Sequence, residues 1–295
     1  MQSHPGLAPV MLQAGLAVLG LCICAASGAQ TVAARDQAPQ PATAMVEDPC
    51  PPALAVPQAI ANLGDAALKP GKPGTDISEI FKNPEVQAYV KAQQERALGD
   101  WPNLCRYRAA NAALAHSPKA VFIGDSITEN WVRGDPALFD QNVLGRGISG
   151  QTSPQILLRF FQDVIDLKPQ IVHIMAGTND VAGNTGPTTE QGFKNNIVAM
   201  VELARAHHIL VVLAAIPPAI RFPWKPALRP ASTITALNQW LRSYALQSGS
   251  RFVDYHSVLA DSQGGFIEAL SNDGVHPNRD GYAVMRTLVL PSIGQ

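Results

Sequence analysis

From Lys119 onward, short apolar runs alternate with longer amphipathic segments. The runs have the length of strands: AVFIG at 120–124, QNVLGRGI at 141–148, IVHIMAG at 171–177, ILVVLAAIPP at 209–218 and FVDYHSVL at 252–259. Strands that are apolar throughout are buried on both faces, which is typical of a parallel sheet covered by helices. The pattern therefore predicts an α/β fold with helices on both sides of a parallel sheet.

The amphipathic segments predict the covering helices. SPQILLRFFQDVIDL at 153–167 has a Ser-Pro start, and a second helix is expected to begin at a capping box of Thr188 and Gln191. ASTITALNQWLRSYALQSG at 231–249 ends at a glycine, which is a common helix stop. A last helix is expected close to the C-terminus, after HPNRDGY.

The composition indicates a globular protein without an electrostatic preference for nucleic acid. The chain has 295 residues, of which 46% are hydrophobic, and 22 Lys and Arg nearly balance 23 Asp and Glu. This much apolar material supports one sizeable core. Because there is no basic excess and no run rich in Lys or Arg, we expect no nucleic-acid partner.

The N-terminal segment lacks charge. Residues 1–34 contain no Asp, Glu, Lys or Arg, and the stretch from Met11 to Gln30 is apolar and then turns to small residues. We interpret residues 1–29 as a secretory signal peptide, which predicts a periplasmic or secreted protein with no stable membrane insertion after cleavage. An uncleaved N-terminal membrane anchor is the alternative, because the uncharged stretch is long enough to span a bilayer.

The rest of the chain divides by composition into three parts. Residues 30–75 are rich in Pro and Ala and are interpreted as a linker. Residues 76–118 are expected to form a helical extension, with Asn83 capping a helix that begins at Pro84. Residues 119–295 contain the alternating pattern and form the main domain.

Two cysteines would remain after removal of the signal peptide. They are Cys50 and Cys105. In an exported chain, two cysteines favour one disulfide, which would stabilise the fold by about 4 kcal/mol in the chain-entropy model. Two unpaired thiols are the alternative.

Residues with distinct chemistry follow the predicted strands. Ser126 follows the first strand, Gly150 the second and Asn179 the third, and Asp273 and His276 lie close together near the C-terminus. In parallel sheets, functional residues gather at the carboxyl ends of the strands near a switch in strand order. We therefore expect these five residues to meet at one edge of the sheet.

These residue types match nucleophilic acyl transfer. A serine hydroxyl needs a base to take its proton, and a neutral imidazole backed by a carboxylate provides one near pH 7. The sequence thus predicts Ser126 as nucleophile, His276 as base and Asp273 as the acid that orients it. The oxyanion hole is expected to consist of the backbone N–H groups of Ser126 and Gly150 and the side chain of Asn179.

The same residues resemble the motifs of the SGNH, or GDSL, hydrolases. The four blocks occur in order as GDSIT, GISGQT, GTND and DGVHP. The resemblance implies a flavodoxin-like three-layer α/β/α sandwich and ester hydrolysis without a metal or cofactor. It extends to exported bacterial lysophospholipase-like and acetylesterase-like members, in which a DW..L.RYR.AN stretch, here Asp100 to Asn111, often precedes the first block.

Other residues offer alternative assignments. His256 is an alternative base, and Asp180 is a rival to Asp273 that we expect instead to hold Asn179 in place. GRGISG at 145–150 matches the dinucleotide fingerprint, but it follows the second predicted strand rather than the first. Because a lone fingerprint is a weak signal, we expect no nucleotide cofactor.

Three aromatic residues lie in segments that we expect at the same edge of the sheet. Trp131 follows the nucleophile, and Phe222 and Trp224 belong to the irregular segment 216–230. We expect them to line the substrate site. In the alternative interpretation, Phe222 and Trp224 only fasten the loop to the body of the protein.

The sequence therefore predicts a serine esterase that hydrolyses carboxylic esters through an acyl intermediate on Ser126. Small acyl esters, lysophospholipids and acetylated carbohydrates are all compatible substrates. Two other functions remain open: an O-acetyltransferase that passes the acyl group to an envelope polysaccharide, and a non-catalytic carbohydrate-binding module.

Overall fold

The computed structural model describes residues 45–71, 80–139 and 142–294. The chain divides into two compact units, residues 1–48 and 49–295, and every element named below belongs to the second. The predicted signal peptide, residues 1–29, lies outside the described residues. None of the described helices is both long enough and apolar enough to cross a membrane.

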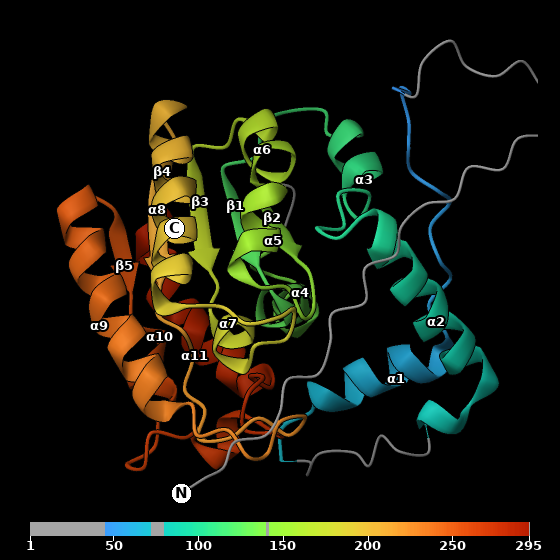
Figure 1. Ribbon diagram of the computed structural model, residues 1–295. Helices are drawn as coiled ribbons and strands as arrows, with labels where there is room; N and C mark the ends of the chain where they lie inside the picture. Colours follow the sequence, from blue (N-terminus) through green and yellow to red (C-terminus); the bar gives the residue numbers. More distant parts are fainter. Residues whose placement is uncertain (1–44, 72–79, 140–141, 295) are drawn as a thin grey trace, which may run out of the picture. The chain divides into compact units, whose positions relative to one another are not determined.

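Five parallel strands form one sheet in the described part of the chain, in the order β2-β1-β3-β4-β5 (Figure 1). The strands are β1 (Ala120–Gly124), β2 (Val143–Gly147), β3 (Ile171–Met175), β4 (Leu210–Ala214) and β5 (Arg251–Val253). The chain starts inside the sheet, moves one way to β2 and then the other way to β3, so a switch in strand order lies at β1. The loops after these strands meet at the carboxyl edge, where ligands bind in such sheets.

Helices cover both faces of the sheet. One face carries α5 (Ser153–Leu158), α6 (Phe160–Asp163), α8 (Glu190–Ala206) and α9 (Ala231–Ser248), and the other carries α4 (Ser126–Gly134), α10 (Tyr255–Leu259) and α11 (Arg279–Val289). Figure 1 shows α8 and α9 in front of the sheet and α10 and α11 behind it. The remaining elements of this region are the short helix α7 (Thr178–Ala182) and the 3-10 helices η2 (Ile165–Leu167), η3 (Glu268–Leu270) and η4 (Leu290–Ile293). The predicted three-layer α/β fold is confirmed.

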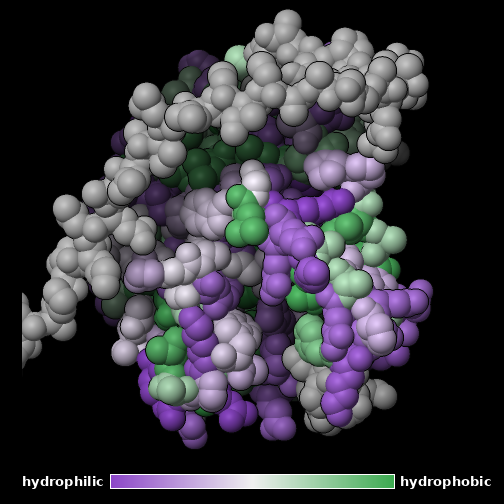
Figure 2. Space-filling view, turned by 45° about the vertical axis from the view of Figure 1, so that its right-hand side comes forward, coloured by the Kyte–Doolittle hydropathy of each residue, from purple (hydrophilic) through white to green (hydrophobic). Residues whose placement is uncertain are grey.

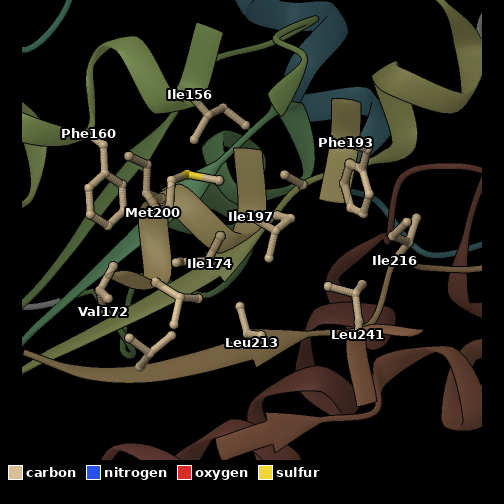
Figure 3. Packing of buried hydrophobic residues seen from close by; sticks show 14 of the residues in the cluster. Ile156, Phe160, Val172, Ile174, Phe193, Ile197, Met200, Leu213, Ile216 and Leu241 are labelled. Atoms are coloured by element: carbon tan, nitrogen blue, oxygen red, sulfur yellow. The ribbon is translucent and has the colours of Figure 1, made fainter. Parts of the chain in front are cut away.

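Alternate residues of each strand enter different cores, as the two-residue period of a strand requires. Val121 and Ile123 belong to the cluster under α5, α6, α8 and α9, whereas Ala120 and Phe122 belong to the cluster under α4, α10 and α11. Figure 3 shows the first cluster, in which Phe193, Ile197 and Met200 of α8 pack among residues of the strands and of α5, α6 and α9. This packing fixes the strands whose ends carry the candidate site.

Among the described residues before the sheet there are three α-helices, α1 (Gln58–Ala67), α2 (Pro84–Gly99) and α3 (Arg108–Ala112), with the 3-10 helix η1 (Ile80–Lys82) before α2. Asn83 caps α2, with its side chain accepting a hydrogen bond from the N–H of Glu85 at 2.8 Å. Helix α1 lies within the segment interpreted as a linker, and Leu68 at its end is buried in the core. Apolar residues interspersed among the alanines of this segment therefore give it a packing surface that composition alone does not reveal.

Three local predictions differ from the structure. Residues 153–167 form α5, α6 and η2 rather than one helix. Residues 252–259 are a strand only to Val253, because Asp254 caps α10 by accepting a hydrogen bond from Ser257 N–H at 3.1 Å. Helix α8 is capped by Thr189 rather than Thr188, through a hydrogen bond from Gly192 N–H.

The predicted disulfide between Cys50 and Cys105 is present. It joins the segment before α1 to the segment between α2 and α3. The disulfide closes a loop that contains α1 and α2, and for a loop of this length the chain-entropy model gives a stabilisation of about 4 kcal/mol.

The surface mixes polar and apolar residues. In the face shown in Figure 2, hydrophobic residues occur in separate patches among hydrophilic ones. Trp101, Leu104, Trp224 and Leu228 are among the exposed large apolar residues. Trp224 and Leu228 lie in the connection between β4 and α9, which begins at the carboxyl edge of the sheet.

Candidate active site

Ser126 is the first residue of α4 and follows the end of β1 almost directly. Asp125 caps the helix, with its carboxylate accepting a hydrogen bond from the N–H of Ile127 at 2.9 Å. The hydroxyl therefore lies at the carboxyl edge of the sheet and at the positive end of a helix dipole, which favours negative charge.

Ser126, His276 and Asp273 form a continuous hydrogen-bonded series. Ser126 Oγ lies 2.9 Å from His276 Nε2, although the two residues are 150 positions apart in the chain. His276 Nδ1 lies 2.7 Å from Asp273 Oδ2. The other carboxylate oxygen of Asp273 accepts hydrogen bonds from the N–H groups of Val275 and His276 at 2.9 and 2.8 Å. The carboxylate thus fixes both the turn and the ring.

The electrostatics of this pair favour an ionised Asp273. Burial disfavours its charged form, but the charge of His276 and the hydrogen bonds from the turn hold the pKa of Asp273 at about 2. Burial also opposes charge on the imidazole, and Asp273 outweighs this effect and raises the pKa of His276 above its ordinary value of 6.5. The side chains of His276 and Asp273 remain 22% and 36% exposed, so the ring is accessible from the surface.

Gly150 lies in the loop that follows β2. Its φ of +80° belongs to the left-handed region, which favours glycine. A Cβ at this position would meet nothing within 4 Å, so the space beside its backbone is open. This geometry leaves room for a ligand against the main chain.

Asn179 lies at the start of α7, directly after β3, and its side chain is buried. Its Nδ2 donates to Asp125 Oδ2 at 3.2 Å and to the carbonyl oxygen of Gln151 at 3.0 Å. Asn184 Nδ2 in turn donates to Asn179 Oδ1 at 2.5 Å, which sets the orientation of the amide. The amide thus lies between the neighbours of Ser126 and Gly150, and an oxyanion would compete with these two acceptors for its N–H groups.

Trp131 does not line a pocket, contrary to the expectation from the sequence. It has no exposed surface and packs against Phe122 and Tyr282, each with its ring centroid 5.6 Å away. Ile127 and Trp131 are four residues apart on α4 and therefore share the face that packs on the sheet. Trp131 is a core residue.

Phe222 and Trp224 stack on each other with ring centroids 5.3 Å apart, but only one of them reaches the site. Phe222 is fully buried, so it fastens the loop and offers no surface to a ligand. Trp224 is 43% exposed, and the centroid of its ring lies 6.3 Å from that of His276. Its Nε1 donates to Asn184 Oδ1 at 3.0 Å, which holds the indole in place.

The rival residues have other contacts. The carboxylate of Asp180 accepts hydrogen bonds from the N–H and the hydroxyl of Ser153, so it holds the start of α5 rather than Asn179. His256 belongs to α10, and burial lowers its pKa. In the ranges that the structure describes, no group of three or more His, Cys, Asp or Glu side chains could hold a metal ion.

Several contact residues of the site have no signal of their own in the sequence. Asn184 and Glu129 hold neighbouring groups through hydrogen bonds but belong to none of the four motif blocks, and Gln151 lies in the GISGQT block without having been assigned a role from the sequence. One sequence signal indicates that residues before β1 belong with the site. The stretch from Asp100 to Asn111 resembles a segment that often precedes the first motif block in similar proteins.

Comparisons with known proteins agree with this geometry. The model of the GDSL-like lipase/acylhydrolase family matches residues 122–284, which is more than half of the chain. A crystal structure of a proposed acylhydrolase from Bacteroides fragilis NCTC 9343 is 46% identical with a TM-score of 0.64, over 66% of this chain and 97% of that one. A GDSL-like lipase from Bacteroides thetaiotaomicron VPI-5482 is 43% identical with a TM-score of 0.63, over 65% of this chain and 98% of that one.

A curated relative matches a smaller region. An uncharacterized lipoprotein of Bacillus subtilis (strain 168) is 40% identical over 82 residues, which are 27% of this chain and 34% of that protein. The chain therefore matches about a third of this relative's length. The family model and the two crystal structures together show that the chain belongs to the GDSL-like lipase/acylhydrolase family of carboxylic ester hydrolases.

Proposed function

We propose that this protein is a serine esterase that forms an acyl intermediate on Ser126. The observation that supports the proposal most directly is the series from Ser126 Oγ through His276 to Asp273, with separations of 2.9 and 2.7 Å. Ser126 Oγ attacks the ester carbonyl carbon while its proton passes to His276 Nε2. Asp273 keeps the other ring proton on Nδ1 and stabilises the imidazolium.

The tetrahedral intermediate places its negative charge at the oxyanion hole. The N–H groups of Ser126 and Gly150 and Nδ2 of Asn179 donate to the oxyanion. Collapse of the intermediate breaks the bond to the alcohol, which leaves with the proton from His276. Water then attacks the acyl group with His276 again as base, which releases the acid and restores Ser126.

The alcohol portion of the substrate leaves beside Trp224. His276 must protonate the leaving oxygen, and Trp224 is the partly exposed aromatic residue whose ring lies 6.3 Å from the imidazole. A cavity of about 510 Å³ is lined by the residues that follow Trp224, Lys225 to Leu228, together with residues 180–183, Pro187 and Thr188. Small acyl esters, lysophospholipids and acetylated carbohydrates each present an alcohol that this surface can contact.

The protein acts outside the cytoplasm in this proposal. Residues 1–29 are removed as a signal peptide, and residues 119–295 form the hydrolase domain. The mature protein is then periplasmic or secreted. The disulfide and the B. subtilis lipoprotein relative support export. N-terminal sequencing of the mature protein tests the cleavage, and a mature chain that begins at Met1 would contradict it.

Replacement of the nucleophile tests the chemistry. Ser126→Ala should abolish hydrolysis of p-nitrophenyl acetate and labelling by a fluorophosphonate probe while the circular dichroism spectrum stays unchanged. Ser243→Ala is a matched control, because the Ser243 hydroxyl donates to the Gln239 carbonyl within α9, on the exposed side of the helix. Retained turnover in Ser126→Ala would refute the proposal.

The substrate class and the acyl acceptor are determined in two separate experiments. An ester panel from acetate to palmitate, with acetylated polysaccharides, identifies the acyl and alcohol portions. Product analysis with and without an acceptor sugar distinguishes hydrolysis from O-acetyl transfer, because transfer requires the acceptor and yields an acylated sugar. Ligand binding without any turnover would instead indicate a carbohydrate-binding module.

A further inference from the structure

The segment Trp101–Asn111, here called the strap, contacts the loop that carries Gly150. This loop, residues 147–151, is here called the oxyanion loop. Tyr107 Oη donates to the carbonyl oxygen of Gly147 at 2.5 Å, at the start of the loop. Gln151 Nε2 donates to the carbonyl oxygen of Pro102 at 2.7 Å, at its end. The strap therefore holds both ends of the five-residue segment that contains Gly150.

A third contact reaches the middle of the oxyanion loop through Glu129. The Glu129 carboxylate accepts from the N–H and the hydroxyl of Ser149 at 2.8 and 2.6 Å. Its other oxygen accepts from Arg106 of the strap at 2.8 Å. Because Glu129 lies one turn after Ser126 on α4, it connects the strap, the residue before Gly150 and the helix of the nucleophile.

A buried network lies beneath these contacts. Arg159 has no exposed surface and donates to the side chain of Gln151, to the carbonyl oxygens of Arg146 and Gly124, and to Asp163. The strap joins the same network through Asn111, whose side chain donates to Asp163 and accepts from Arg146.

The strap is itself anchored. Cys105 is bonded to Cys50, and Asp100 accepts hydrogen bonds from the N–H groups of Leu104 and Cys105. The guanidinium of Arg146 lies 4.8 Å from the centre of the Tyr107 ring, which keeps the phenol directed at the oxyanion loop. Burial raises the pKa of Tyr107 to about 12, so its hydroxyl remains a donor at neutral pH.

We propose that the strap is part of the catalytic apparatus, in which Tyr107 is a positioning residue that holds the Gly150 N–H in place for the oxyanion, with the Cys50–Cys105 disulfide as its anchor. This inference rests on the proposed role of Gly150. The geometry explains why residues before β1, outside the region matched by the family model, belong with the site.

Contacts beyond the strap also hold the oxyanion loop: the Ile148 N–H donates to the carbonyl oxygen of Gly124 at 3.1 Å, and Asn179 Nδ2 donates to the carbonyl oxygen of Gln151 at 3.0 Å. Gly150 itself has a positive φ and open space around its α-carbon, so the position of its N–H depends on the contacts of the neighbouring residues. A small displacement of a preorganised donor lowers the rate of the chemical step more than it weakens substrate binding, because the oxyanion exists only after attack. A positioning role thus has a kinetic signature that a purely structural role lacks.

Tyr107→Phe tests the inference by removing only the hydroxyl. The expected result is a fall in kcat of about tenfold, with KM within twofold of the wild-type value. Affinity for a boronic acid, which forms a tetrahedral adduct on Ser126, should fall in parallel with kcat. Tyr89→Phe is the matched control, because the Tyr89 hydroxyl accepts a hydrogen bond from Gln93 on α2 and, among the described residues, has no hydrogen bond to the oxyanion loop. Its kinetics should equal those of the wild type.

A second variant tests the anchor. Replacement of both Cys50 and Cys105 by Ser should lower kcat several-fold with KM preserved, and dithiothreitol should do the same to the wild type but not to this double variant. If Tyr107→Phe keeps the kcat of the wild type while Ser126→Ala is inactive, the proposed role of the strap is refuted and the proposed function stands. Activity in Ser126→Ala would instead refute the proposed function itself.

Discussion

The two segments that meet at Ser126 are held in opposite ways. The turn 273–276 positions His276, the proposed base, through local contacts, in which Asp273 binds the ring of His276 and the N–H groups of Val275 and His276. The oxyanion loop is held by contacts from distant parts of the chain, including Pro102, Tyr107 and Glu129. One half of the site is therefore encoded within a few residues, and the other half depends on the assembled fold.

This difference has an energetic cause. A turn that satisfies its own backbone N–H groups orders only a few residues, at a cost of about 1–2 kcal/mol per residue in backbone entropy. A loop held from outside also requires the ordering of the segments that hold it, and here one of these segments is fixed by a disulfide. Disturbing the strap should therefore affect the oxyanion loop and leave the pair of Asp273 and His276 in place, because the chain before β1 contacts the region of that turn at another point, where Asn272 Nδ2 donates to the carbonyl oxygens of Ala67 and Lys69.

Asp273→Asn attacks the local half and should have the largest effect. An amide that donates to His276 Nδ1 stabilises the wrong tautomer, so kcat should fall by about 10⁴-fold. The acid limb of the pH profile of kcat/KM should also move to lower pH. Only neutral His276 accepts the proton, and the variant loses the carboxylate that raises the pKa of His276 above 6.5. In the wild type the limb lies above pH 6.5, and in the variant the residual activity should persist to lower pH.

A second carboxylate serves as control for this variant. Asp261 also accepts hydrogen bonds from N–H groups of its own turn, at Gln263 and Gly265, but it faces no imidazole. Asp261→Asn should keep kcat and the acid limb within twofold of the wild type. A loss below tenfold in Asp273→Asn, or a flat wild-type profile down to pH 4, would be incompatible with the assignment.

Asn179→Ala tests the half of the site that is assembled from distant segments of the chain. Removal of one oxyanion donor should lower kcat by about 10²–10³-fold with little change in KM. Steady-state kinetics with p-nitrophenyl acetate measures this effect, and Asn196→Ala, which removes a similar amide that donates to Ser153, should leave kcat nearly unchanged. Equal losses in both variants would mean that general destabilisation, rather than a missing donor, explains the result.

The sequence predicts the local half of the site more completely than the other half. The strands are uninterrupted apolar runs, and the ends of β1, β2 and β3 carry Ser126, Gly150 and Asn179 close to the strands themselves, so pattern and motif are enough to place them. Asp273 and His276 share one turn, so their contact is also contained in a short stretch. The disulfide could be predicted because only two cysteines remain after residue 29.

The contacts made by the rest of the chain could not be predicted. Trp131 follows Ser126 closely in sequence, but its position on α4 directs it into the core, a fact that depends on which face of the helix meets the sheet. The ties from Tyr107 to Gly147 and from Gln151 to Pro102 join residues separated by 40 and 49 positions and follow no periodic pattern. Such contacts become visible only once the fold brings the segments together.

The smallest expected effect concerns the amide of Asn179, which the loop between β4 and α9 orients from outside. Trp224 Nε1 donates to Asn184, and Asn184 donates to Asn179, so the indole fixes the amide through one intermediate. Trp224→Phe retains a ring but removes the donor, which costs about 1 kcal/mol for a single hydrogen bond. We expect kcat to fall about fivefold while KM and the preference for acyl chain length stay as in the wild type.

Trp224→Ala distinguishes the effect of the hydrogen bonds from Trp224 through Asn184 to Asn179 from the effect of the contact between Trp224 and the alcohol. It removes the donor and the ring together, so kcat should fall as in Trp224→Phe and KM should rise as well, because the ring beside His276 is lost. If Trp224→Phe leaves kcat unchanged, the amide of Asn179 is held by Asp125 and Gln151 alone and the outside support is confined to the oxyanion loop. If Trp224→Ala lowers only the melting temperature, Trp224 fastens the loop as Phe222 does, and neither residue contacts the substrate.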